Sequence, residues 1–178
     1  MRLGVAATPE VAVPTLNWLK TSGHTLVRVI SQPDKASGRG QEMNSSPVSQ
    51  WAKTNSIELI TPTTVSEIDG GLSDLDLLIT IGYGRILPAT TLLIPKFGCI
   101  NLHFSLLPKY RGAAPVQRAI EAGETESGVS VFALDPGMDT GPIYTSITVP
   151  IDSTMRSYEL LKIATPVVII AGCVFVVK

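Results

Sequence analysis

Short hydrophobic runs alternate with amphipathic stretches along the chain, and this pattern predicts alternating strands and helices. Strand character, either β-branched or continuously apolar, is found in six segments: Leu3–Ala7, Thr25–Ser31, Leu75–Ile81, Phe97–His103, Gly128–Leu134 and Ile143–Val149. The run Leu75–Ile81 contains one acidic residue and is otherwise almost wholly apolar, which is typical of a parallel strand covered on both faces.

Three segments have the features of helices. Thr8-Pro9 has the residue types of an N-cap and first helical position, before an apolar stripe that ends at Ser22-Gly23. Ser46-Pro47 opens a second helix that extends to about Thr54, and Ala113–Ala122 is the third. Strands that alternate with helices predict an α/β fold with right-handed crossovers.

One polar segment is longer than an ordinary connection between a strand and a helix. Gln32–Asn44 contains two glycines and is predicted to be a loop. Because ordinary connections of this kind are short, its length suggests a functional role.

Composition narrows the class of protein. The 178 residues suit one domain, and 44% hydrophobic with 16% charged residues indicates a globular chain. A net charge of -1 gives no global field for nucleic acid, so any RNA contact needs a local basic patch. The spacing of Cys99 and Cys173 matches no metal-binding motif. We expect both to be buried, reduced thiols and not to form a disulfide.

The ends of the chain predict a cytoplasmic protein. The N-terminus has no pattern of a signal peptide. The apolar tail Pro166–Val177 has 12 residues, whereas a helix that spans a bilayer needs roughly 20. No association with a membrane is therefore expected.

Polar residues stand at the end of the strand predicted over Phe97–His103. Because side chains alternate along a strand, Cys99, Asn101 and His103 share one face. They lie at the carboxyl end, where open α/β sheets bind their ligands. The position fits a catalytic site, and it fits equally a hydrogen-bonded histidine at a strand end without a chemical role.

A second candidate, Asp139, lies between Gly137 and Gly141 in a short turn. Glycines there permit positive-φ backbone or the close approach of another segment. An aspartate in such a turn more often stabilises the turn itself, so the local sequence leaves both roles open. The segment Tyr110–Pro115 has the glycine, proline and arginine residues of a pocket wall.

Several motifs occur together in a recognisable order. The run GCINLHFSLLPKYRGAAPVQRAI, followed by GMDTG, resembles the formyltetrahydrofolate-dependent formyltransferase family, and the resemblance extends from Met1 to about Leu161. The segments ATPEVAVPTL, SQPDKASGRG with SPV, and YGRILP are similar to the members of that family that act on methionyl initiator tRNA.

The resemblance implies a Rossmann-like fold, with an open, mostly parallel sheet and helices on both faces. It implies a catalytic domain over residues 1–162, followed by an atypical apolar tail over 163–178. The C-terminal tRNA-binding β-barrel domain of the family is expected to be absent, and the chain is expected to be a monomer if the tail is ordered.

The resemblance also implies a reaction in translation initiation. The donor would be 10-formyltetrahydrofolate, the acceptor would be the α-amino group of methionyl initiator tRNA, and no metal would take part. Asn101 would donate to the oxyanion, His103 would exchange protons, and Asp139 would orient His103. Whether His103 or Asp139 is the formal base is left open.

Further residues are assigned to binding by the same resemblance. The donor would contact Tyr83, Ile86, Leu87, Ser105, Leu106, Leu107 and Pro108. Lys35 and Arg39, in the long polar segment, would contact the tRNA. The alternatives are a sugar amine or a glycinamide nucleotide as acceptor, or a chain that binds folate and transfers nothing.

Overall fold

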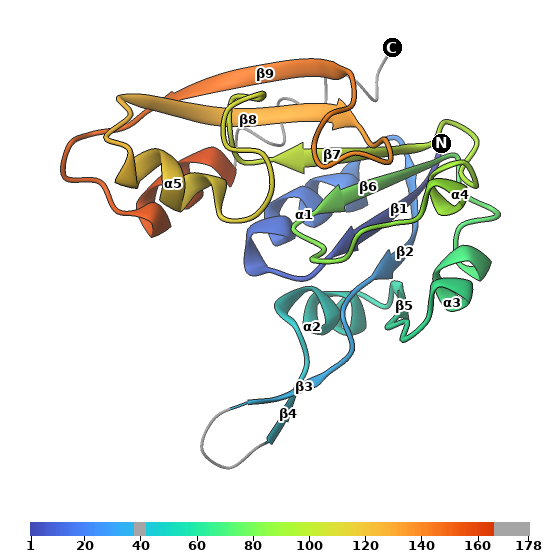
Figure 1. Ribbon diagram of the computed structural model, residues 1–178. Helices are drawn as coiled ribbons and strands as arrows, with labels where there is room; N and C mark the ends of the chain where they lie inside the picture. The colour runs from blue at the N-terminus through green and yellow to red at the C-terminus, as the bar shows by residue number, and fades with distance from the viewer. Residues whose placement is uncertain (38–41, 166–178) are drawn as a thin grey trace. The chain divides into compact units, whose positions relative to one another are not determined.

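The computed structural model describes residues 1–37 and 42–165, and the chain divides into two compact units after Cys99 (Figure 1). In the first unit, four strands run parallel in the order β5-β2-β1-β6. Their bounds are β1 (Arg2–Ala7), β2 (Thr25–Ile30), β5 (Glu58–Ile60) and β6 (Leu77–Ile81). Every residue of β6 is buried, as its apolar run predicted.

Helices cover both faces of these four strands. From β1 the chain passes through the 3-10 turn η1 (Glu10–Ala12) and α1 (Val13–Thr21) to β2, and then through α2 (Pro47–Thr54) to β5. Both steps move along the sheet in one direction, whereas the return to β6 through α3 (Val65–Gly70) moves in the other. Right-handed crossovers therefore put α1 and α2 on one face and α3 on the opposite face. The short helix α4 (Ala89–Leu92) follows β6 and contacts α3.

The structure corrects the predicted start of the first helix. Pro9 precedes η1 as its cap residue, and α1 begins only at Val13. The Thr8 hydroxyl instead donates to the Tyr83 carbonyl oxygen at 3.2 Å. The start of α2 is as predicted, because the Ser46 hydroxyl accepts from the Ser49 N–H at 2.9 Å.

The long polar segment is not a plain loop. It contains β3 (Lys35–Ser37) and β4 (Glu42–Asn44), which pair in an antiparallel hairpin. Strands of three residues are too short for a period of two to be visible in the sequence. The strand β5 and the helices α3 and α4 were not predicted either, because segments of three to six residues are too short to show the period of a strand or of a helix.

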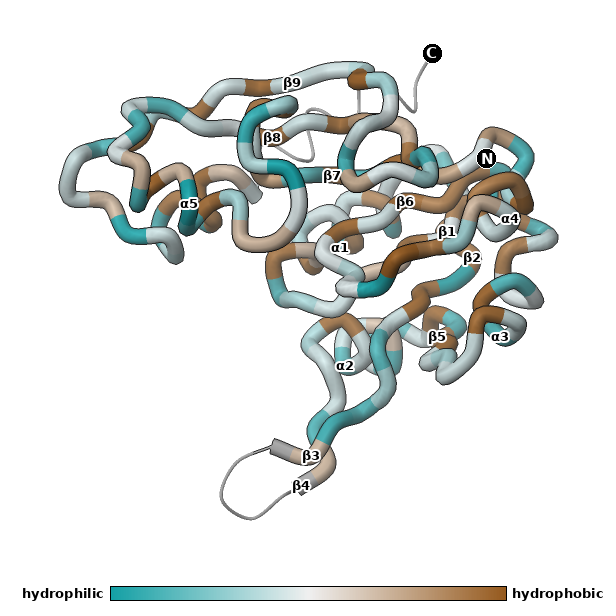
Figure 2. Tube along the Cα trace, viewed as in Figure 1, coloured by the Kyte–Doolittle hydropathy of each residue, from teal (hydrophilic) through white to brown (hydrophobic). Residues whose placement is uncertain are grey.

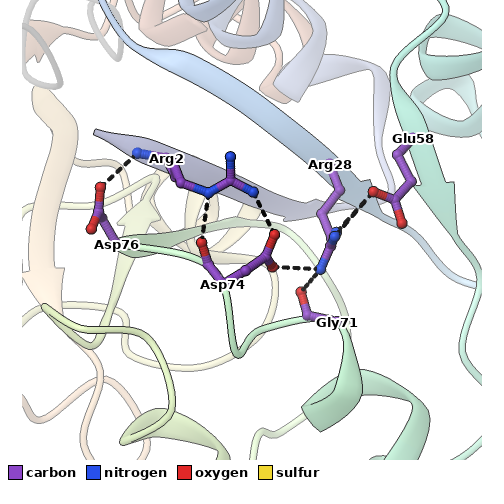
Figure 3. A network of polar contacts seen from close by, with 6 residues as sticks. All are labelled: Arg2, Arg28, Glu58, Gly71, Asp74 and Asp76. Atoms are coloured by element: carbon purple, nitrogen blue, oxygen red, sulfur yellow. Dashed lines mark hydrogen bonds and ion pairs between the residues drawn. The ribbon is translucent and has the colours of Figure 1, made fainter.

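A network of four charged residues joins three strands of the first unit to the turn before β6 (Figure 3). The Arg28 guanidinium from β2 reaches Glu58 of β5 at 3.0 Å and Asp74 at 2.9 Å, and Asp74 also pairs with Arg2 of β1. Arg28 is mostly buried, with 12% of its side chain exposed, whereas its partners are about half exposed. The Arg2 hydrogen bond, with the nearby Arg28 charge, holds the pKa of Asp74 below its usual range.

The second unit contains three antiparallel strands in the order β7-β8-β9. Their bounds are β7 (Cys99–His103), β8 (Glu126–Ala133) and β9 (Ile143–Pro150). The helix α5 (Pro115–Glu121) is shorter than predicted because Ala114, with a φ of 56°, is left-handed and cannot belong to it.

The apolar residues concentrate in the strands of the sheet. Figure 2 shows brown, apolar segments among the strands of the first unit, and all residues of β1 after Arg2 are buried. Residues 157–165 form a further helix, and the predicted apolar tail lies outside the described residues from residue 166 on. Within the described ranges, no helix is long and apolar enough to cross a membrane.

Candidate active site

Asn101 and His103 lie two residues apart on β7, where Asn101 pairs with Phe132 and His103 with Ser130 of β8. The His103 ring is 7% exposed and meets the edge of the Phe132 ring, with centroids 6.4 Å apart and planes at 86°. Phe132 is fully buried. A buried aromatic neighbour of this kind restricts rotation of the imidazole.

A main-chain group determines which nitrogen of His103 carries a proton. Nε2 lies 2.9 Å from the Tyr110 carbonyl oxygen, which can only accept a hydrogen bond. Nε2 therefore carries the hydrogen, and the neutral ring has its lone pair on Nδ1.

Asp139 faces that nitrogen, with Oδ2 3.7 Å from His103 Nδ1. The same carboxylate oxygen accepts from the Gly112 N–H at 2.6 Å. Asp139 is mostly buried, with 15% of its side chain exposed. At 3.7 Å the two atoms are too far apart for a direct hydrogen bond.

The turn around Asp139 is stabilised by a different aspartate. Asp135 accepts from the Gly137 N–H at 3.0 Å and from the Thr140 hydroxyl at 2.8 Å. Its presence leaves Asp139, with a φ of 51°, to direct its carboxylate toward His103 and Gly112. A Cβ on Gly141 would lie 1.8 Å from the Ala133 carbonyl oxygen, so the prediction of close approach at this glycine is confirmed.

Left-handed backbone is concentrated around this site. Of the four residues other than glycine with positive φ in the described ranges, Tyr110, Ala114 and Asp139 belong to the two loops that meet at His103. Such conformations persist only when the surrounding contacts hold them, and they are frequent at functional sites.

In the first unit, the donor-binding predictions fall on a loop with an ordered backbone. The Tyr83 carbonyl accepts from Thr8 and from Gln32, and Arg85 donates to the Pro62 carbonyl at 2.9 Å. Leu87 is buried, whereas Ile86 is 85% exposed and so presents an apolar side chain at the surface.

The Tyr83 side chain is unusual in this loop. Its hydroxyl is buried and makes no hydrogen bond of good geometry within the described ranges, although the Arg85 guanidinium lies nearby. Burial raises the pKa of Tyr83, while the charge of nearby Arg85 acts in the opposite direction. Such a buried hydroxyl is available to hydrogen-bond a ligand or a water.

In the second unit, the predicted donor-binding residues form the loop after β7. Ser105 and Leu107 are buried, Leu106 is half-buried and Pro108 is exposed. A cavity of about 230 Å³ lies beside Leu106 and Pro108 and continues along Tyr110 and Ser127. Typical ligand sites are larger, so this cavity by itself does not accommodate a whole folate.

The two basic residues predicted to contact tRNA belong to the hairpin of the first unit. Lys35 lies on β3 and is exposed, and Arg39 lies outside the described residues. Across residues 1–37 and 42–165, no group of three histidine, cysteine or acidic residues is arranged to hold a metal ion.

Several residues at the site were not singled out from the sequence. Ser130, Phe132 and Asp135 support the two loops, and the Gly112 N–H and Tyr110 carbonyl oxygen contact the candidate acid–base pair directly. The last two are main-chain groups, and the only available signal was that Tyr110–Pro115 had been predicted to wall a pocket.

Comparison with known proteins identifies the family. The model of the formyl transferase family matches residues 1–165. The chain belongs to the formyl transferase family. The curated methionyl-tRNA formyltransferase of Pseudomonas fluorescens (strain SBW25) is 48% identical over 155 residues, which are 85% of this chain and 49% of that protein. The chain spans about half the length of the curated relatives it matches.

Solved structures of formyl transferases confirm the fold class. Phosphoribosylglycinamide formyltransferase from Anaplasma phagocytophilum superimposes with a TM-score of 0.80 at 22% identity, over 98% of this chain and 85% of that one. An N-formyltransferase from Helicobacter canadensis, in complex with folinic acid and dTDP-3-aminofucose, has a TM-score of 0.70 at 24% identity, over 93% and 59%. The predicted Rossmann-like α/β fold is therefore confirmed.

Proposed function

We propose that the chain transfers a formyl group from 10-formyltetrahydrofolate to the α-amino group of methionyl initiator tRNA. The observation that carries the chemistry is the pair of His103 Nδ1 and Asp139 Oδ2, which face each other at 3.7 Å within an otherwise ordered site. The choice of acceptor rests on the similarity to a relative named methionyl-tRNA formyltransferase. Residues 1–162 are the proposed catalytic domain.

In the proposed reaction the acceptor amine is itself the nucleophile. Its nitrogen attacks the formyl carbon, and the carbonyl electron pair moves to oxygen to give a tetrahedral intermediate. The Asn101 side-chain amide is proposed to donate to that oxyanion. Collapse reforms the carbonyl and breaks the bond to the folate nitrogen, which leaves with a proton.

His103 and Asp139 are proposed to manage the protons of these steps. The amine loses a proton after the attack, and His103 Nδ1 is the ring nitrogen with a free lone pair. Asp139 stabilises the imidazolium that results, because its carboxylate lies close to Nδ1. His103 is then the formal base and Asp139 the group that orients and stabilises it.

The substrates are proposed to use the remaining residues. In the first unit Tyr83, Ile86 and Leu87 are proposed to contact the folate, supported by the buried Tyr83 hydroxyl and the exposed Ile86 side chain. In the second unit the same is proposed for Ser105–Pro108, and Lys35 and Arg39 are proposed to contact tRNA phosphates. Because the acceptor is a tRNA, the cytoplasm is the proposed location.

A formylation assay on the purified chain tests the proposal. Charged initiator tRNA, a glycinamide nucleotide and an amino-sugar nucleotide are compared as acceptors, each with 10-formyltetrahydrofolate. We expect a formylated product only when charged initiator tRNA is the acceptor. Exclusive use of either small amine would refute the acceptor, and binding of a folate analogue without turnover of any acceptor would refute catalysis.

A further inference from the structure

Tyr110 forms hydrogen bonds with two residues from different parts of the second unit, His103 on β7 and Glu124 after α5. Its carbonyl oxygen lies 2.9 Å from His103 Nε2, and its hydroxyl donates to Glu124 Oε1 at 2.8 Å. The main chain of Tyr110 thus meets the candidate base, while its side chain meets a carboxylate that takes no part in the proposed reaction. A change in the position of the Tyr110 side chain therefore also affects the carbonyl that hydrogen-bonds His103 Nε2 and determines the tautomer of its ring.

Tyr110 needs such an anchor because its backbone is left-handed, with a φ of 57°. A bulky residue relaxes from this conformation unless its surroundings hold it. The preceding residue is held as well, since the Ser105 hydroxyl donates to the Lys109 carbonyl at 2.7 Å. If Tyr110 returned to negative φ, its carbonyl oxygen would turn away from His103.

Both the main chain and the side chain of Glu124 are held by hydrogen bonds. It follows the end of α5, and its N–H donates to the Ala119 carbonyl at 3.1 Å. Its carboxylate accepts from Lys109 Nζ at 2.9 and 3.0 Å, and its side chain is 24% exposed. The hydrogen bonds from Lys109 and then from Tyr110 hold the pKa of Glu124 below its usual range, so the acceptor is charged at neutral pH.

We propose that Glu124 is a positioning residue for His103. Through the Tyr110 hydroxyl it holds the Tyr110 carbonyl against Nε2, and it thereby keeps the lone pair of the neutral ring on Nδ1, toward Asp139. The expected effect of Glu124 on the rate of formyl transfer rests on the proposed function, whereas its expected effect on the His103 tautomer does not.

The tautomer is measured directly in the whole chain by long-range proton–nitrogen NMR of the imidazole rings. The protein has two histidines, so His24 serves as a reference in each spectrum. Tyr110→Phe removes only the hydroxyl, and we expect the ratio of Nε2–H to Nδ1–H at His103 to fall about threefold to tenfold. His24 should not change.

Variants of the carboxylate extend the test. Glu124→Ala should lower the tautomer ratio as Tyr110→Phe does, whereas Glu124→Gln should retain most of it because an amide oxygen still accepts from the hydroxyl. Tyr158→Phe and Glu121→Gln are matched controls at exposed positions, where neither side chain contacts the site. If Tyr110→Phe does not fold, the comparison of Glu124→Ala with Glu124→Gln decides.

Kinetics give the second measurement. In Glu124→Ala we expect kcat for the initiator tRNA to fall about tenfold with KM unchanged, because Glu124 acts on the acid–base group and does not line the cavity beside the proposed folate-binding loop. An unchanged tautomer ratio in folded Tyr110→Phe would overturn the proposal. A shifted ratio in a chain that formylates nothing would support the positioning role and refute the proposed function.

Discussion

Ser130 provides the most direct test of how the site is built. Its hydroxyl is fully buried on β8 and accepts from the Leu107 N–H at 3.1 Å. It donates its single proton to the Ser105 carbonyl at 2.8 Å, and its oxygen lies 2.9 Å from the Ser146 hydroxyl. One side chain therefore fixes the loop that follows His103.

The cost of Ser130→Ala can be worked out from these contacts. The Leu107 N–H would be left buried without this acceptor, which costs about 1–3 kcal/mol, and loss of the bond to Ser105 adds about 0.5–1.5 kcal/mol. We expect the free energy of unfolding to fall by about 1.5–4.5 kcal/mol. For a chain of this size the midpoint of thermal unfolding should fall by about 3–18 °C.

Urea unfolding followed by circular dichroism measures this loss, with the slope m required to stay constant. Ser146→Ala is the matched control, because it removes one hydroxyl of the same cluster from an exposed position and should cost within about 0.5 kcal/mol. If Ser130→Ala costs no more than Ser146→Ala, the loop regains its hydrogen bonds from water and the reasoning is wrong.

Three further predictions concern other groups. The substitution Asp139→Asn keeps an acceptor for the Gly112 N–H but removes the negative charge beside His103. We therefore expect kcat for formylation to fall about 100-fold or more. An unchanged kcat would remove Asp139 from the mechanism. Asp74→Asn should cost about 0.5–1 kcal/mol at neutral pH, since Asp74 is 41% exposed. Because the folded-state pKa of Asp74 is lowered, this difference should be lost as the pH falls through that pKa, and a difference in unfolding free energy that does not shrink as the pH is lowered would contradict it. Burial raises the pKa of Cys99 to about 12, so peptide mapping should find it alkylated by iodoacetamide only after unfolding, and labelling of the native chain would argue against that burial.

Much of the fold could be predicted from the sequence because its strands are long enough to have a pattern. Leu75–Ile81 predicted a strand buried on both faces, and β6 is buried throughout. The hairpin of β3 and β4 could not be predicted, since its strands have three residues each and are held by pairing with each other. Propensity also failed at Thr8, where the hydroxyl found a tertiary partner instead of a helix terminus.

The sequence by itself predicted the residues of the candidate site, and it placed two of them on one face of a strand. The period of a strand places Asn101 and His103 on one side of β7, and the glycines around Asp139 indicate close approach of another segment. Both predictions use only the types of residues that are close together in the sequence, so they need no knowledge of the tertiary structure.

Only the tertiary structure decided what His103 can do. The ring nitrogen that keeps the lone pair is selected by the carbonyl of Tyr110, and the carboxylate that faces it is held by the N–H of Gly112, 27 residues away from Asp139. Every residue but proline has the same main-chain N–H and carbonyl groups, so their use cannot be inferred from the order of side chains. Their directions are set by the left-handed backbone at Tyr110 and Asp139, which the surrounding contacts maintain.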